Sequence, residues 1–302
     1  MKHLLSIEEL SAEEMIDLVD LGVELKKSRH DRRPLAGQSW ALIFSKSSTR
    51  TRVSFEVGVR ELGGTAIFFS ADDLQLGRGE PMEDTARVMG RMLHGAIIRT
   101  YGQDEVVAFA HHSGIPTINA LTDAEHPCQI LADLLTIKEK LGTWEGKKIV
   151  FVGDATSNMA KSWMWAADKL PFELILAAPE AYQPSRTELE PFKSGRVHCE
   201  SDCLKAGEHA DVLYTDVWVS MGQEEESADR LNAMTSYQIN DELLAVANPG
   251  ALVLHCLPAY REKEITEAVL EAHATTIFDQ AENRLHAQKA VLVRLAEAQA
   301  SS

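Results

Sequence analysis

The sequence predicts an α/β fold of two doubly wound domains, each with a central parallel sheet flanked by helices. Short runs of large apolar residues, which are typical of buried strands, alternate along the chain with helix-length segments. Strands that alternate with helices form parallel sheets. The chain has 302 residues, which suggests about two domains with a substantial core in each. The expected strands span residues 39–44, 65–69, 95–99, 115–118, 148–152, 174–177, 212–215 and 251–254.

Two local signals place the first helix and the domain boundary. Ser11 and Glu14 have the spacing of a capping box, which opens an amphipathic helix. Its expected buried positions are Met15, Ile16, Leu18, Val19, Val23 and Leu25. The boundary is expected in the segment 141–146, Leu-Gly-Thr-Trp-Glu-Gly, after a long helix. We therefore predict a first domain over residues 1–141 and a second over residues 147–282.

The stretch 45–52, Ser-Lys-Ser-Ser-Thr-Arg-Thr-Arg, lies between an expected strand and an expected helix over residues 53–62. Backbone N–H groups and the helix dipole collect an anion at such a junction. An N-cap followed by two surface arginines explains the same pattern, and this stretch alone does not separate the two interpretations. The hydroxyl and guanidinium donors that suit phosphate are Ser48, Thr49, Arg50 and Thr51. The apolar positions of the helix that follows are Val53, Phe55, Val57, Val59 and Leu62.

Composition excludes several classes of partner. With 30 basic and 46 acidic residues the net charge is −16, so nucleic acid and anionic membranes are not expected partners. The N-terminus has no basic segment before an apolar core, and no apolar run approaches the length of a membrane span. Four scattered cysteines do not form a disulfide framework. We expect a cytoplasmic protein in which an anion site is a local positive pocket.

Polar residues at strand and helix ends are the candidate site residues of the first half. Arg99 ends an apolar strand, where a structural salt bridge is the alternative explanation. His126 and Gln129 lie three residues apart at the start of a helix, with Pro127 suited to its first turn. A polar helix cap explains the histidine equally well. A His and a Gln at a helix N-terminus also suit the binding of a carbonyl and an amide.

The second half offers a carboxylate and a thiol at strand ends. Asp216 follows the strand 212–215, where a carboxylate could bind an amino group. Cys256 follows the strand 251–254 and could be reactive, although a lone cysteine is more often simply buried. Gly153 stands alone after its strand, without the G-x-G-x-x-G pattern, so a dinucleotide-dependent dehydrogenase is poorly supported. The set His198, Cys199 and Cys203 has no second matching pair, and a metal site is not expected.

Taken together and in order, these motifs closely resemble the aspartate/ornithine carbamoyltransferase family. The resemblance runs over the whole chain and includes the segments 76–87 and 281–284. Any one motif is weak, but five in register are strong. The motifs are Ser48-Thr49-Arg50-Thr51, Arg99 before Thr-Tyr-Gly-Gln, His126-Pro-Cys-Gln129, Asp216 with Ser220-Met221-Gly222, and His255-Cys256-Leu257-Pro258.

The resemblance implies transfer of a carbamoyl group from carbamoyl phosphate to the side-chain amine of L-ornithine, giving L-citrulline and phosphate for arginine biosynthesis. It implies no metal and no organic cofactor, an active site in the cleft between the domains, and a C-terminal helix, 283–302, that returns to the first domain. It also implies a homotrimer whose active sites are shared between subunits through Gln75. The residues implied to bind carbamoyl phosphate are Ser48, Thr49, Arg50, Thr51, Gln75, Arg99, His126, Gln129, Cys256, Leu257 and Arg284. Those implied to bind ornithine are Asn158, Asp216, Ser220 and Met221.

Arg50, Arg99, His126, Asp216 and Cys256 are the expected catalytic residues. Attack of an amine on a carbonyl builds negative charge on the oxygen, which preorganised donors such as Arg99 and His126 stabilise. Arg50 would stabilise the departing phosphate. Positioning of both substrates can supply roughly 7–11 kcal/mol of the barrier without a covalent intermediate. We expect Cys256 and Asp216 to orient and deprotonate the amine.

Some residues depart from the pattern of the family. Ser157 precedes Asn158 where a second asparagine is common, and Ser45 precedes Lys46 where Glu is common. Tyr260 and Glu262 stand where His and Gly are common. Two other functions stay open: a carbamoyltransferase for another amine, such as putrescine, agmatine or an N-acylated ornithine, and a non-catalytic paralogue that binds carbamoyl phosphate.

Overall fold

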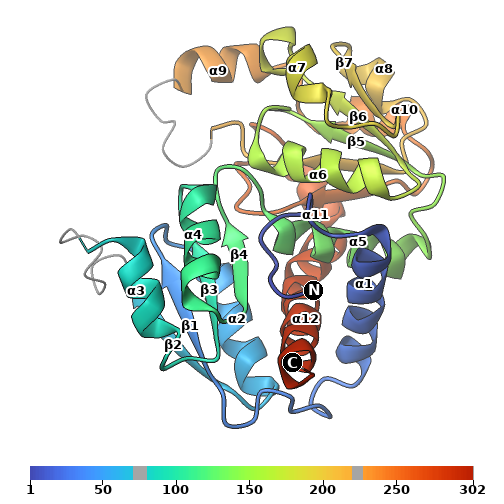
Figure 1. The fold of residues 1–302 in the computed structure, drawn as a ribbon. Coiled ribbons are helices and arrows are strands. Elements are labelled where there is room, and N and C mark those ends of the chain that lie inside the picture. Colours follow the sequence, from blue (N-terminus) through green and yellow to red (C-terminus); the bar gives the residue numbers. More distant parts are fainter. Residues whose placement is uncertain (71–79, 220–226, 302) are drawn as a thin grey trace. The chain divides into compact units, whose positions relative to one another are not determined.

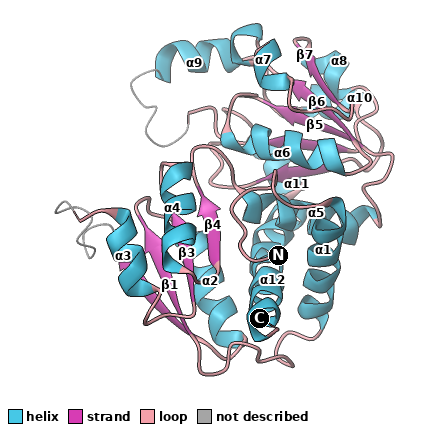
Figure 2. Ribbon diagram, viewed as in Figure 1, coloured by secondary structure: helices cyan, strands magenta, loops and turns pink. Residues whose placement is uncertain are grey.

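The computed structural model describes residues 1–70, 80–219 and 227–301 (Figure 1). The chain divides into two compact units. Unit 1 comprises Met1–Leu135 and Glu282–Ser302, and unit 2 comprises Thr136–Ala281. The helices α5 (Pro127–Leu141) and α12 (Ala274–Ala300) each run from one unit into the other. The strands of each unit lie between helices, as the two-domain α/β prediction requires (Figure 2).

Unit 1 contains a four-stranded parallel sheet in the order β2-β1-β3-β4. Its strands are β1 (Ser39–Phe44), β2 (Thr65–Ser70), β3 (Gly95–Arg99) and β4 (Thr117–Leu121). The predicted strand over 115–118 was therefore misplaced. Pro116 has no N–H to donate, and the strand begins only after it. It continues instead through Asn119 and Ala120, both fully buried.

The helices of unit 1 follow the predicted signals with two corrections. They are α1 (Ala12–Lys27), α2 (Thr49–Glu61), α3 (Met82–Met89) and α4 (Gln103–Ser113), with parts of α5 and α12. The Ser11–Glu14 capping box is present at α1, but Ile16 is exposed and Leu21 and Gly22 are buried in its place. The helix α2 begins at Thr49, earlier than predicted, because Ser48 caps it. Val53 is exposed, and the buried side of α2 includes Gly58.

The core of unit 1 fixes the ends of its strands. Side chains of β1 and β3, such as Ile43 and Ile98, pack with Val106 and Phe109 of α4. Gly95 begins β3 where a Cβ would lie 2.4 Å from the ring of the fully buried Trp40. This close contact leaves no room for a larger residue, so it sets the approach of β3 to β1. At the other end of β3, Arg99 pairs with Phe44 of β1.

Unit 2 contains a five-stranded parallel sheet in the order β7-β6-β5-β8-β9. Its strands are β5 (Lys148–Val152), β6 (Glu173–Ala177), β7 (Val197–Glu200), β8 (Val212–Thr215) and β9 (Leu252–His255). The strand β7 was not predicted. It is an edge strand whose four residues are all at least partly exposed, and Val-His-Cys-Glu contains no apolar run. Its helices are α6 (Asn158–Lys169), η3 (Glu180–Tyr182), α7 (Arg186–Leu189), α8 (Cys203–Gly207), α9 (Ser227–Met234), α10 (Asp241–Val246) and α11 (Glu267–Ala272).

Apolar packing within unit 2 supports the central strands. Val150 of β5, Leu213 of β8 and Val253 of β9 belong to one buried cluster with Leu243 of α10 and Leu270 of α11. This core holds β8 and β9 side by side, and both carry candidate site residues at their carboxyl ends. Within the part of the chain that the structure describes, no helix is long and apolar enough to cross a membrane.

Candidate functional site

The turn 45–48 joins β1 to the N-terminus of α2, so strand, turn and helix follow one another in the predicted order. Ser45 N–H donates to the Arg99 carbonyl at 2.8 Å, which joins the turn to the end of β3. Ser48 is the N-cap: its hydroxyl accepts from Thr51 N–H at 3.3 Å and donates to Thr51 Oγ1 at 3.0 Å. This 13-residue helix directs its N-terminal N–H groups and the positive end of its dipole at this turn.

The two arginines of this stretch have different surroundings. Arg52 donates to Glu56 at 2.8 Å and lies over the Phe68 ring, so for this residue the surface explanation is correct. Arg50 is exposed, and no hydrogen bond or ion pair joins it to another residue of the described ranges. Its guanidinium is therefore available to an anion at the same turn.

Arg284 of α12 connects the N-terminus of α2 with α5. Its Nη2 donates to Thr51 Oγ1 at 3.1 Å, and its Nη1 donates to Gln129 Oε1 at 2.7 Å. The three side chains are buried. Residues that are far apart in the sequence thus form one hydrogen-bonded group in unit 1, which the separate motifs alone could not establish.

Arg99 and His126 are both nearly fully buried. The pKa of His126 is held well below its ordinary value, first by burial and then by the positive charges of Arg284 and Arg99. The imidazole is therefore neutral at neutral pH, and a neutral imidazole can still donate one hydrogen bond. Together these residues form a positive, donor-rich region inside a chain with a net charge of −16.

Lys46 is a buried cation that the sequence analysis did not assign to the site. It forms an ion pair with Asp123 and lies 4.1 Å from the centre of the Tyr101 ring. Its place in the stretch 45–52, directly after a buried strand, was the available signal.

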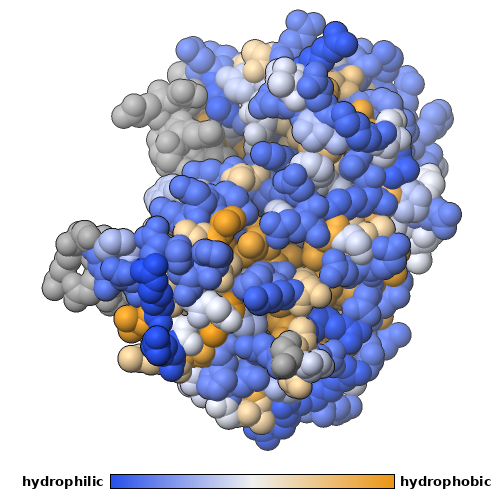
Figure 3. Space-filling view, in the orientation of Figure 1, coloured by the Kyte–Doolittle hydropathy of each residue, from blue (hydrophilic) through white to orange (hydrophobic). Residues whose placement is uncertain are grey.

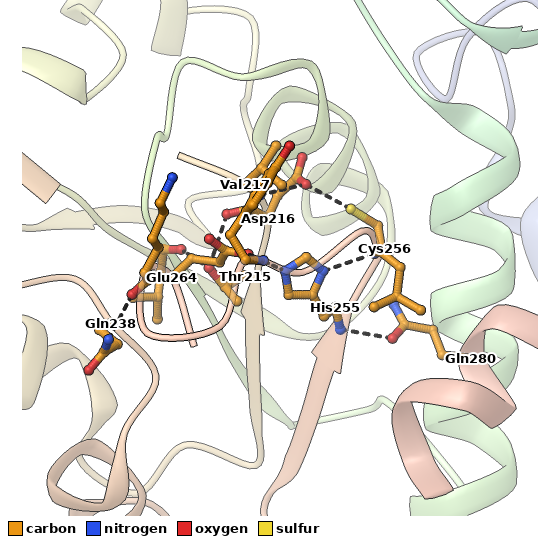
Figure 4. Close-up of polar contacts among 12 residues, drawn as sticks. Thr215, Asp216, Val217, Gln238, His255, Cys256, Glu264 and Gln280 are labelled. Carbon is orange, nitrogen blue, oxygen red and sulfur yellow. Dashed lines mark hydrogen bonds and ion pairs between the residues drawn. The ribbon is translucent and has the colours of Figure 1, made fainter. Parts of the chain in front are cut away.

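In unit 2 the ends of β8 and β9 bring Asp216 and Cys256 together (Figure 4). The parallel register pairs Thr215 with His255, so the next residue of each strand lies at the same edge. The Cys256 thiol donates to Asp216 Oδ1 at 2.9 Å, and Val217 N–H donates to the same oxygen at 2.7 Å. Burial raises the pKa of Asp216, while His255 and these two hydrogen bonds act in the opposite direction.

A buried histidine–glutamate pair lies beside this carboxylate and thiol. Leu257 N–H donates to His255 Nδ1 at 2.8 Å, so the proton of a neutral ring is on Nε2, which contacts Glu264 Oε1 at 3.1 Å. The side-chain oxygen Oε1 of Gln280 accepts from His255 N–H at 2.9 Å. Sequence reasoning missed Glu264, which stands in a charged segment that reads as solvent-exposed. The pair fixes the loop that carries Cys256.

The remaining candidates are placed as follows. Asn158 is the first residue of α6 and follows the Ser157 N-cap; β5, which precedes it, is a neighbour of β8. Leu257 has a positive φ of 57°. Gln75, Ser220 and Met221 lie outside the described residues. Within the described ranges no group of three His, Cys, Asp or Glu residues is arranged to hold a metal ion.

The fold and the site define a class: a two-domain α/β protein with hydroxyl and guanidinium donors at a helix N-terminus, and with a carboxylate–thiol pair at parallel strand ends. Residues 2–139 match the model of the aspartate/ornithine carbamoyltransferase carbamoyl-P binding domain, and residues 145–295 match its Asp/Orn binding domain. The chain belongs to the aspartate/ornithine carbamoyltransferase family.

Similar proteins cover the whole chain. An ornithine carbamoyltransferase of Akkermansia muciniphila is 60% identical over 307 residues, covering 99% of each chain. One of Methanocorpusculum labreanum is 48% identical and covers 97% of this chain and 98% of its own. The crystal structure of an anabolic ornithine carbamoyltransferase from Campylobacter jejuni has a TM-score of 0.93 at 42% identity, covering 99% of this chain and 100% of its own.

The raised pKa of Asp216 predicts that this carboxylate costs stability at neutral pH. Because the folded state binds the proton more tightly than the unfolded state, the free energy of unfolding falls as pH rises above about 3.9, the reference pKa of Asp. Asp216→Asn removes this cost, so the variant should gain stability over the wild type, and more at pH 7.5 than at pH 4.5. Urea denaturation at both values measures the difference. A variant that is destabilised equally at both pH values would contradict the prediction.

Proposed function

We propose that this protein transfers the carbamoyl group of carbamoyl phosphate to the side-chain amine of L-ornithine, which gives L-citrulline and phosphate. The observation that carries the proposal is the hydrogen-bonded group of Thr51, Gln129 and Arg284 beside an anion-binding helix N-terminus. It stands in a chain that matches ornithine carbamoyltransferases over its whole length.

The phosphate is held by the N-terminal turn of α2. Ser48, Thr49 and Thr51 provide hydroxyl and backbone donors, and Arg50 provides a guanidinium fork. The departing phosphate gains charge as the bond to the carbamoyl carbon breaks. Donors that are already in place stabilise this charge without a cost of reorganisation.

The carbamoyl end is held by Arg99, His126 and Gln129. Arg99 and the neutral imidazole of His126 donate to the carbonyl oxygen, on which negative charge develops during attack. Gln129 contributes its amide, and Arg284 joins this end to the phosphate end through its two hydrogen bonds. Contacts of Cys256, Leu257 and Gln75 with this substrate stay predictions.

The ornithine is held by Asn158 and Asp216 of unit 2, with Ser220 and Met221 as further predicted contacts. An alkyl amine with a reference pKa of about 10.4 arrives protonated and must lose a proton before it attacks. A buried carboxylate with a raised pKa is a better proton acceptor than an ordinary one. The Cys256 thiol, which donates to Asp216, orients this carboxylate and takes part in the proton transfer.

The assembly we propose is a homotrimer. The edge strand β2 exposes Ile67, and Val88 and Met92 of the α3 region are also exposed. Figure 3 shows hydrophobic surface on this side of unit 1. An exposed edge strand beside apolar side chains is the type of surface that a second copy covers.

The location we propose is the cytoplasm. The four cysteines, none of which forms a disulfide, are consistent with it.

The substrate and the anion site are tested together by measuring citrulline formation, with putrescine, agmatine and N-acetylornithine in parallel. We expect selective turnover of ornithine. Arg50→Ala should lower kcat/KM by about 10²–10³-fold, the loss typical of one transition-state donor. Arg60→Ala, an exposed arginine in the last turn of the same helix, is the matched control and should match the wild type. Turnover of another amine alone would leave the phosphate site intact but contradict the ornithine assignment. Binding of carbamoyl phosphate without any turnover would favour the non-catalytic paralogue.

The role of Cys256 in proton transfer is tested with Cys256→Ser. A hydroxyl can still donate to Asp216, but it ionises far less readily than a thiol with a reference pKa of about 8.5. We expect a lower kcat and a shifted pH profile of kcat, with little change in KM for carbamoyl phosphate. An unchanged kcat and pH profile would show that the thiol takes no part in proton transfer.

The trimer is tested by the mass in solution. Light scattering should give about three times the chain mass of 33.4 kDa, and Ile67→Lys should lower this mass together with the specific activity. A fully active protein with the mass of one chain would contradict the proposal.

A further inference from the structure

Asp133 is a buried carboxylate to which neither the sequence analysis nor the proposed reaction assigns a role. Its side chain is fully buried in α5, inside the apolar run Ile-Leu-Ala-Asp-Leu-Leu over residues 130–135. A carboxylate removed from water is costly unless it accepts strong hydrogen bonds. Asp133 Oδ1 accepts from Gln129 Nε2 at 2.8 Å, one helical turn earlier on the same face.

The amide of Gln129 is held between an acceptor and a donor. Its Nε2 contacts the Asp133 carboxylate, and its Oε1 contacts Nη1 of Arg284 at 2.7 Å. Asp133 Oδ1 is the acceptor of its contact, and a guanidinium only donates hydrogen bonds. A turned amide would place oxygen against oxygen and N–H against N–H. These two neighbours therefore select one of the two amide orientations.

The selected orientation decides what Gln129 offers to a ligand. Its carbonyl oxygen faces the side on which Arg284 lies, close to Arg99 and His126. The carbamoyl carbon carries a carbonyl oxygen, which needs donors, and an amino group, which needs an acceptor. Arg99, His126 and Arg284 supply donors. Gln129 Oε1 supplies the acceptor only while its amide is kept in this orientation.

We propose that Asp133 is a positioning residue: it fixes the amide of Gln129 so that the site presents an acceptor to the –NH2 of the carbamoyl group. This inference rests on the proposed function of Gln129. It also makes Asp133 a determinant of specificity. Acetyl phosphate has a methyl group in place of the –NH2, gains nothing from an acceptor and leaves it without a partner.

The first experiment compares Asp133→Asn with Glu139→Gln. Both substitutions replace a carboxyl group of α5 with an amide, but Glu139 is exposed. Dissociation constants are measured for carbamoyl phosphate, acetyl phosphate and inorganic phosphate. An asparagine amide can turn either its oxygen or its –NH2 toward Gln129, so D133N no longer selects one orientation. We expect D133N to weaken the binding of carbamoyl phosphate by up to about tenfold, the effect of one misoriented hydrogen-bond partner, and the binding of the other two ligands by less than about twofold. E139Q should match the wild type for all three. If D133N weakens the binding of all three ligands equally, or weakens none of them, the proposal is wrong.

The second experiment shows whether Asp133 acts through Gln129. In the Gln129→Ala background, D133N should change the affinity for carbamoyl phosphate by less than about twofold, because the amide that it positions is absent. A full additional loss in that background overturns the proposal. If Q129A itself leaves carbamoyl phosphate binding unchanged, the proposed role of Gln129 in binding this substrate is wrong, and the role of Asp133 is wrong with it. If Q129A weakens the binding of carbamoyl phosphate but D133N alone does not, only the proposed role of Asp133 is wrong.

An exchange of the two groups covers the case in which D133N does not fold. Q129E alone places two carboxyl groups against each other. In Q129E/D133N the asparagine –NH2 can donate to the glutamate, and the second glutamate oxygen still faces Arg284. We expect the double variant to recover folding, judged by its melting temperature, and selective binding of carbamoyl phosphate over acetyl phosphate. If the double variant also fails to fold or to select, Asp133 serves the stability of the core alone and the proposal is wrong.

Discussion

Parallel pairing of neighbouring strands is the constraint on which the candidate site depends. In unit 2 the register of β8 with β9 sets Thr215 opposite His255, and the next residues, Asp216 and Cys256, are joined by a hydrogen bond. In unit 1 the pairing of β1 with β3 brings the turn before α2 to the end of the strand that carries Arg99. Chain segments separated by tens of residues thus supply one chemical group each to the same edge of a sheet.

The second constraint is electrostatic. Arg99, Arg284 and the helix N-terminus gather positive charge in a region where His126 is driven to its neutral form. Such a region is unfavourable in the absence of an anion. Arg284 is held in it by a hydrogen bond to Gln129, whose amide donates in turn to Asp133. A doubly charged phosphate relieves the repulsion between these cations. The chain therefore holds a costly arrangement that its proposed substrate stabilises.

Much of this architecture could be predicted because it depends on local patterns. Within the described ranges, apolar runs indicated eight of the nine strands, although the start of β4 was placed two residues too early. The caps at Ser11 and Ser48 are local hydrogen-bonding patterns. The edge strand β7 was not predicted, because a partly exposed strand needs no apolar run. The exposed Ile16 and Val53 show that helical periodicity does not fix which side of an apolar stripe meets the core.

The buried residues that hold the candidate site residues in place were harder to predict than the site residues themselves. Lys46, Asp133 and Glu264 are charged residues whose burial depends on tertiary contacts, and in the sequence they look like ordinary surface residues. Asp133, inside an apolar run, and Lys46, directly after a buried strand, carried a local signal, but Glu264 did not. The contacts of Arg284 with Thr51 and Gln129 join three helices, and no spacing along the chain encodes them.

The most direct measurement is a crystal structure of this protein with carbamoyl phosphate bound. The account predicts the phosphate at the N-terminus of α2, in contact with Arg50 and with N–H groups of residues 48–51. It also predicts the carbamoyl oxygen beside Arg99 and His126, and the amino group on Gln129 Oε1. A phosphate bound away from α2, or an amino group directed away from Gln129, would contradict it.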